Sequence, residues 1–298
     1  MTKSLRSVLV NALLYLCAAA LVLYVVAPFL WALSASFQLE TALFKQPPDW
    51  IPEEPTTANY TYIFTGKVPS AYGERGLLRS PITQEARLIL PGMVNSFIVA
   101  VSVTLINLVL GAIAAYTFAR ERFRGHGTAY LIILGSRLLP AIAVVIPIYM
   151  TVNVLGMLDT KRGLILMHTA FTLPFTVWVL TLYFRRLPRE PEEAALVDGC
   201  TRFGTLRHIV LPLAAPGLAA VGVFAFLFSY SEFLFGLFTT QSVNSKTVPV
   251  IISAVSKNPD ASYTLIAVGV LLSIIPPMLV ALGFRRYLVS GLATSLGQ

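Results

Sequence analysis

Long apolar segments, separated by short polar ones, dominate the pattern of this chain. A bilayer has a hydrocarbon core of about 30 Å, which a helix of roughly 20 apolar residues crosses. Six segments are long enough, and they lie at about residues 8–36, 91–119, 128–152, 163–184, 213–240 and 261–284. Because lipid cannot satisfy free backbone groups, each segment is expected to be a helix. Prolines inside them, such as Pro140, are interpreted as kinks buried against neighbouring helices.

The composition agrees with this pattern. Hydrophobic residues make up 56% of the chain and charged residues 12%, and the mean hydropathy is +0.75. The chain is therefore expected to be an all-α membrane protein, with a single transmembrane domain over residues 1–298. Its two cysteines, Cys17 and Cys200, give neither a disulfide framework nor a metal-ligand spacing. No catalytic motif is found in the sequence, so neither an enzyme nor a metal site is expected.

The distribution of Lys and Arg predicts the orientation in the membrane. Short basic loops stay in the cytoplasm, and the loops on the side of both termini hold more basic residues than the opposite side. The opposite side has the long segment 40–87, which also carries acids and weighs little in this comparison; prolines and aromatic residues favour an ordered cap there. Both termini are therefore expected in the cytoplasm. The formal charge of +8 follows from this topology and from attraction to anionic membrane lipid, and no nucleic acid is expected as a partner.

A polar segment at residues 185–212 interrupts the apolar pattern, and its residues predict a helix-turn-helix. Pro191 suits the first turn of a helix, and Gly199 lies where a left-handed residue would end it. Thr201 can then cap a second short helix. On that helix Leu206, Ile209 and Val210 share a face before Pro212 ends the run; a solvated connector, whose acids balance its arginines, is the alternative interpretation of the segment.

The residues of this segment carry a resemblance to a known family. They include Glu193, Ala194 and Ala195, then Asp198 and Gly199, then Leu211, Pro212 and Leu213, and finally Pro216 and Gly217. This pattern closely resembles the EAA loop of permease subunits in binding-protein-dependent ABC importers. Further motifs that resemble the carbohydrate-uptake branch are Asn95-Ser96, residues 119–125, Leu139-Pro140 and residues 286–292. The similarity covers essentially the whole chain, and it is to the second, maltose-type permease.

The resemblance implies a type I ABC importer permease fold in a bacterial or archaeal inner membrane. It also implies a non-catalytic subunit that moves a sugar or sugar-like solute into the cytoplasm by alternating access. Its partners would be a second permease subunit in a heterodimer, an ATPase dimer and a soluble or lipid-anchored solute-binding protein. This chain would hold no cofactor, because ATP and Mg²⁺ would be bound by the partner ATPase.

The family's functional positions carry over to two loops. The residues expected to couple this chain to the ATPase are Glu193, Ala194, Ala195, Asp198 and Gly199. The loop from Gln241 to Asp260 resembles the extracytoplasmic loop that reaches into the binding protein. Its candidates for that contact are Asn244, Ser245 and Lys246.

Two charged residues, Arg137 and Glu232, lie within predicted spans, where a charge is a functional candidate. Both are candidates for the solute pathway. The alternatives are structural, with Arg137 snorkelling or bonding carbonyls of a broken helix near Pro140, and Glu232 facing extracytoplasmic water. Their depths differ too much for them to pair with each other. The histidines, His168 among them, are scattered and are interpreted as structural.

Another class of protein also fits six spans. A stand-alone secondary transporter or channel would have the same hydropathy, but it would leave the segment 185–212 without a role and would place broken-helix repeats around a midplane site. The sequence does not identify the solute. A disaccharide, an oligosaccharide, a polyol, an anionic glycoside and glycerol phosphate all remain open.

Overall fold

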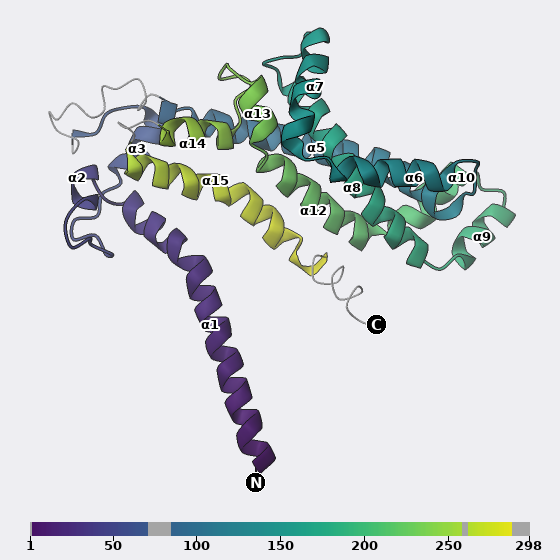
Figure 1. Cartoon of the computed structure of the whole chain (residues 1–298), viewed down its shortest axis with the longest axis horizontal. Coiled ribbons are helices and arrows are strands. Elements are labelled where there is room, and N and C mark those ends of the chain that lie inside the picture. Colours follow the sequence, from purple (N-terminus) through teal and green to yellow (C-terminus); the bar gives the residue numbers. More distant parts are fainter. Residues whose placement is uncertain (1, 71–84, 258–261, 288–298) are drawn as a thin grey trace. The chain divides into compact units, whose positions relative to one another are not determined.

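The computed structural model describes residues 2–70, 85–257 and 262–287, with side chains from residue 7 onward. Within these ranges every regular element is a helix, as Figure 1 shows. The expected all-α membrane fold is therefore confirmed. The chain divides into two compact units. Three helices have residues in both units: α5 (Ile89–Arg120), α14 (Val248–Ser256) and α15 (Tyr263–Gly283). Unit 1 comprises Met1–Leu90 and Ile252–Ile274, and unit 2 comprises Pro91–Ile251 and Ile275–Gln298.

Four helices are each long and apolar enough to span a membrane by themselves. They are α1 (Thr2–Ser36), α5 (Ile89–Arg120), α8 (Lys161–Arg186) and α15 (Tyr263–Gly283). Two bent helix pairs pass the same test of length and hydropathy, which brings the total among the described residues to six if each pair is one span. Pro174 lies within α8, and Pro276 and Pro277 lie within α15, and neither helix is interrupted at them.

The segment predicted as a single span at 128–152 is two helices. Helix α6 (His126–Gly135) continues into the 3-10 turn η3 (Ser136–Leu138), and α7 (Ala141–Val154) follows at 104° to it. Pro140 was expected to kink a helix, but it lies between the two helices in an extended conformation. Proline clashes with the preceding helical turn and disfavours helical backbone in the residue before it, which explains a break rather than a kink.

The segment predicted as a span at 213–240 is also interrupted. Helix α12 (Ala215–Tyr230) has 16 residues, about 24 Å, which is shorter than a bilayer core. After the break at residues 231–233, the short helix α13 (Leu234–Thr239) packs against α7 and α8. Irregular backbone of this kind inside a membrane is tolerated where it is buried in protein or lines a water-filled cavity.

Unit 1 contains the ordered part of the long loop after α1. Two short helices, α2 (Glu40–Leu43) and α3 (Ala58–Thr65), lie in it. The fully buried amide of Asn59 donates to the carbonyls of Ser36 and Gln38 at 2.9 and 2.8 Å. The carboxylate of Glu40 accepts from the Ser262 hydroxyl at 2.6 Å and from the Tyr263 amide at 3.1 Å, and so caps the start of α15. These contacts tie the described part of the loop to α1 and α15; residues 71–84 of the predicted cap lie outside the described residues.

Unit 2 is built around α8, along which α12 packs. A Cβ added to Gly217 of α12 would stand 2.8 Å from the ring of Tyr183 on α8, so this close approach requires glycine. The buried core at one end of the unit joins α5 and α8 to the segment before α12. Its members include Ala112, Ala115, Tyr116, Leu180, Phe184, Leu206, Val210 and Ala214.

Candidate functional site

The first helix of the predicted helix-turn-helix is α9 (Glu190–Val197). Pro191 lies in its first turn, together with three acidic residues that suit the positive end of the helix dipole. At its end the Gly199 amide donates to the Leu196 carbonyl at 3.2 Å and the Cys200 amide to the Ala195 carbonyl at 2.9 Å. Gly199 has a φ of +87°, so the predicted left-handed residue is confirmed. A Cβ on Gly199 would meet no atom within 4 Å, and the demand for glycine therefore comes from the backbone alone.

The second helix begins as predicted and ends differently. The Thr201 hydroxyl accepts from the Gly204 amide at 3.1 Å and starts α10 (Arg202–Thr205). The chain then forms a π-helical turn, η4 (Leu206–Val210), and α11 (Leu211–Leu213). The expectation that Pro212 ends the run is wrong, because the helix continues through Pro212 to Leu213. The π turn before Pro212 contains one extra residue, which changes the backbone hydrogen-bond pattern where proline has no N–H to donate. The backbone bends by 82° only between Leu213 and Ala215.

The second helix holds the loop against the spans. Leu206 and Val210 are 4% and 0% exposed and pack with α5 and α8, while Ile209 of the same predicted face is half-buried. Each buried aliphatic side chain contributes about 1.5–3 kcal/mol. The loop is therefore a fixed part of unit 2 and not a solvated connector.

An ion pair that the sequence analysis missed anchors the first helix. The Arg120 guanidinium, at the end of α5, donates to Glu192 on α9: Nε to both carboxylate oxygens at 3.0 Å and Nη2 to Oε1 at 2.6 Å. Nη2 also donates to the Leu187 carbonyl at 3.2 Å, and the two side chains are only 5% and 7% exposed. Removing one partner of such a buried pair costs about 3–5 kcal/mol. The available signals were an arginine that ends a span and a second acid beside Glu193.

The surface of the loop that faces away from the core carries most of the predicted coupling residues. Glu193, Ala194, Asp198 and Gly199 are exposed, whereas Ala195 is buried. Two large apolar side chains, Val197 and Phe203, are also 86% and 62% exposed there, and the sequence analysis did not single them out. Acidic and apolar side chains on one free surface are suited to bind a partner protein.

A family model described as "Binding-protein-dependent transport system inner membrane component" matches residues 107–294, which is more than half of the chain. The chain belongs to this family. The permease is 29% identical to the sulfoquinovosyl glycerol transport system permease protein SmoH of Agrobacterium fabrum, over 89% of this chain and 86% of that one. It is 32% identical to the trehalose transport system permease protein SugB of Mycobacterium tuberculosis, over 91% and 92%.

The fold is also similar to that of a solved ABC transporter chain. A crystal structure of a bacterial ABC transporter for import of the acidic polysaccharide alginate contains a chain that matches with a TM-score of 0.73 and 20% identity, over 94% of this chain and 95% of that one. The predicted resemblance and the importer-permease fold are confirmed. The chain is a multi-pass inner-membrane permease subunit of an ABC importer and not an enzyme, and its family implies an ATPase and a binding protein as partners.

Arg137 of the permease makes the structural contacts that the sequence left open. Its Nη1 donates to the Phe171 carbonyl of α8 at 2.9 Å, and its guanidinium carbon lies 4.6 Å from the centre of the Phe171 ring. The carbonyl belongs to α8, one turn before Pro174, and not to the break at Pro140 as the structural alternative had it. Arg137 thus ties the break after α6 to α8.

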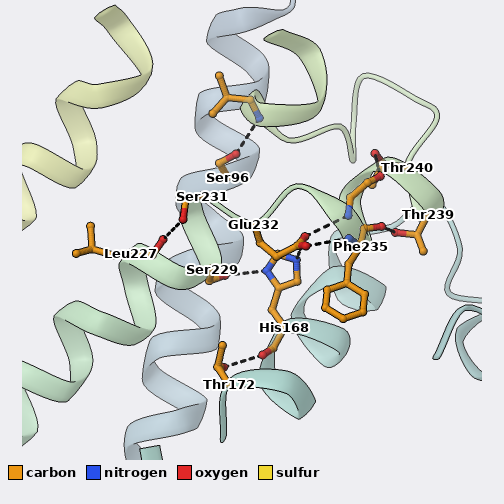
Figure 2. A network of polar contacts seen from close by, with 12 residues as sticks. Ser96, His168, Thr172, Leu227, Ser229, Ser231, Glu232, Phe235, Thr239 and Thr240 are labelled. Carbon is orange, nitrogen blue, oxygen red and sulfur yellow. Dashed lines mark hydrogen bonds and ion pairs between the residues drawn. The ribbon is translucent and has the colours of Figure 1, made fainter. Parts of the chain in front are cut away.

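Glu232, whose side chain is 15% exposed, joins a polar cluster with His168 and Ser229, shown in Figure 2. His168 Nε2 lies 3.2 Å from Glu232 Oε2, and Nδ1 lies 2.9 Å from the Ser229 hydroxyl. The same carboxylate accepts from the Phe235 and Gly236 amides at 2.9 and 3.3 Å and so caps α13. A cavity of about 350 Å³, lined in part by these residues, adjoins the cluster.

The three candidates for binding-protein contact occupy different positions. Asn244 is exposed and Lys246 half-buried, but Ser245 is fully buried and donates to the carboxylate of Asp159. Asp159 also accepts from the Gln241 and Ser242 amides at 2.8 and 2.9 Å. Burial raises the pKa of Asp159, but the hydrogen bonds from Ser245 and these amides outweigh it and lower the pKa to about 2. Asp159 therefore fixes the start of this loop.

Proposed function

We propose that this chain is the second, maltose-type permease of an importer that takes up a sugar or sugar-like solute by alternating access. A partner ATPase dimer would bind ATP and Mg²⁺, and its closure would move the loop from α9 to α11. The observation that carries the proposal is the construction of this loop. It is anchored by a buried ion pair and a buried apolar face, while its outer surface stays free for the ATPase.

A second permease subunit completes the proposed complex. The most apolar window of α1 has no buried residue, which leaves that helix available to lipid and to another subunit. Charge in the loops supports cytoplasmic positions for both termini and for the α9–α11 loop. Asn244, at the exposed tip of its loop, is the strongest of the three candidates for contact with the binding protein.

The two broken spans are the proposed borders of the solute pathway. Substrate sites of transporters form where helices are interrupted near the membrane midplane. Arg137 and Glu232 lie at the breaks after α6 and α12, and each holds its break against α8. We propose that they position the backbone that lines the pathway.

The solute class is proposed from relatives, two of which are named for trehalose and for sulfoquinovosyl glycerol. A neutral disaccharide and an anionic glycoside are the two leading candidates. A binding screen on the solute-binding protein encoded beside this permease distinguishes them, because that protein can be purified and tested in solution.

Copurification tests the proposed assembly. The tagged permease, extracted in mild detergent, should bring down a second permease and an ATPase. A stand-alone transporter or channel, the alternative function, would purify without either subunit and would catalyse uptake after reconstitution alone. That result would overturn the proposal.

A further inference from the structure

Unit 2 contains a basic cavity that the importer mechanism does not use. Its volume is about 860 Å³, and its lining includes the arginines Arg120, Arg122, Arg185 and Arg189, with Glu121 as the one acid. Glu121 is already paired with Arg202, whose Nη1 lies 3.0 Å from its carboxylate. Arg120 is paired with Glu192, so the excess positive charge of the cavity comes from Arg122, Arg185 and Arg189, which form no ion pair with the described residues.

Several donors in this cavity lack a partner. Arg120 donates from Nε and Nη2 to the Glu192 carboxylate and from Nη2 to the Leu187 carbonyl. Its Nη1 is buried and has no hydrogen-bond partner in the described part of the chain. The side chains of Arg122 and Arg189 make no hydrogen bond or ion pair with any described residue. A buried, unsatisfied guanidinium nitrogen is rare in a native structure and points to a missing acceptor.

The position of the cavity indicates where that acceptor would come from. Its lining includes the last residue of α5, Arg185 near the end of α8 and the first residue of α6, and both α5 and α8 are long and apolar enough to span the membrane. Figure 1 shows α6 beside α8. Phe118 lines it, and the centre of the Phe118 ring lies 5.9 Å from that of Phe123 and 5.3 Å from that of Tyr130. Aromatic residues and arginines at the end of spans mark the level of lipid headgroups.

We propose that this cavity binds a phosphate-bearing anion, supplied by the headgroup of an anionic phospholipid. Phosphate oxygens accept the paired N–H groups that a guanidinium presents, and basic pockets between spans bind anionic headgroups. A cavity of this volume is in the range of small-molecule sites. The headgroup contacts the same arginine that holds Glu192, so lipid charge acts on the anchor of the α9–α11 loop.

The test compares two double variants of the complete importer. Arg122→Gln with Arg189→Gln, the cavity variant, removes two arginines that line the cavity, whereas Arg124→Gln with Arg285→Gln, the control variant, removes two that do not. All four arginines are exposed, so the two variants differ in the cavity and not in exposure. Each complex is placed in nanodiscs of phosphatidylcholine, with or without phosphatidylglycerol. Native mass spectrometry measures retained phosphatidylglycerol, and ATP hydrolysis is measured with loaded binding protein.

The wild type and the control variant should retain phosphatidylglycerol and show higher stimulated hydrolysis with it. The cavity variant should lose retention on the order of tenfold and lose the lipid dependence. Equal retention by both double variants would overturn the proposal. Loss of the ATPase from the cavity variant in both lipids, with retention unchanged, would show a protein-docking surface instead and would also overturn it.

A further arm identifies the source of the phosphate. Inorganic phosphate is titrated into the wild-type complex in phosphatidylcholine alone, and we expect no stimulation. Restoration by inorganic phosphate would overturn lipid as the source. The hydrolysis readout rests on the proposed function, but headgroup retention does not, because it is measured on the permease whether or not an ATPase is bound.

Discussion

The guanidinium of Arg120 at the end of α5 and the carboxylate of Glu192 in the first turn of α9 form a buried, multiply hydrogen-bonded ion pair across 72 residues of sequence. Neighbouring Glu193 is exposed. Two adjacent glutamates thus have different environments, one holding the loop to a span and the other facing outward. Their substitutions are expected to have different consequences.

Glu192→Gln should lower the thermal stability of the purified permease, because it leaves a buried guanidinium without its counter-charge at a cost of about 3–5 kcal/mol. Glu193→Gln is the matched control and should change stability by less than about 0.5 kcal/mol. Thermal unfolding in detergent compares the two. Equal midpoints for both variants would contradict the anchoring role of the pair.

Arg137→Gln should reduce solute uptake roughly tenfold while complex yield and basal ATP hydrolysis are retained, because it loosens the break that borders the pathway. Arg162→Gln, at an exposed position near the start of α8, is the control. Uptake by reconstituted vesicles and subunit ratios on a gel are measured together. Unchanged uptake removes Arg137 from the pathway, and a fall in yield assigns it to structure alone.

The depressed pKa of Asp159 makes the loop after α13 sensitive to strong acid only. A carboxyl with a pKa of about 2, against an ordinary value of 3.8, stabilises the folded loop above pH 3.8 and loses that effect as the pH falls through about 2. Solvent screens a half-exposed carboxylate, so the contribution is about 1 kcal/mol. Asp159→Asn should lower the hydrogen-exchange protection of the Gln241 and Ser242 amides already at neutral pH. Equal protection in the two proteins at pH 7 would refute the role of Asp159.

Orientation is testable with the native thiols. Cys17 and Cys200 are both exposed, and Cys200 lies in the loop proposed to be cytoplasmic. In a Cys17→Ala background, Cys200 should resist an impermeant thiol reagent in intact cells and react after lysis. A Pro55→Cys substitution in the Cys17→Ala, Cys200→Ser background should react in intact cells. Labelling of Cys200 in intact cells would reverse the topology.

Local sequence signals predicted the parts of the loop that depend on backbone chemistry. Pro191, Gly199 and Thr201 each act through their own dihedral angles or a hydrogen bond within three residues, so their roles can be derived from adjacent positions. Hydropathy likewise located the spans. It did not predict the breaks after α6 and α12, because hydropathy is averaged over a window of about 20 residues, and the single charge at each break, Arg137 or Glu232, changes that average little.

The contacts that hold the site together could not be derived in this way. Arg120 meets Glu192 across 72 residues, and His168 meets Ser229 across 61. Both pairs depend on how α5, α8 and α12 pack, which no periodicity encodes. For this reason His168 was interpreted as a lone structural residue, and its contact with Glu232 was not predicted.

The central claim is that the α9–α11 loop transmits ATPase closure to the spans. Gly199→Val should insert normally, because the loop lies outside the apolar spans. It should disturb the turn after α9, because most residues other than glycine cost on the order of 1 kcal/mol or more at positive φ. Gly156→Val is its control, since Gly156 also has positive φ (+65°) and open space around it but follows α7 instead. Glu193→Lys tests the outward acid.

The most direct measurement is solute uptake, together with ATP hydrolysis stimulated by loaded binding protein, in the complete complex carrying Gly199→Val and Glu193→Lys separately and together. The account predicts that each variant loses uptake, with the ATPase either dissociated or hydrolysing ATP without stimulation, while Gly156→Val retains both activities. Full uptake and full stimulation in both loop variants would contradict it.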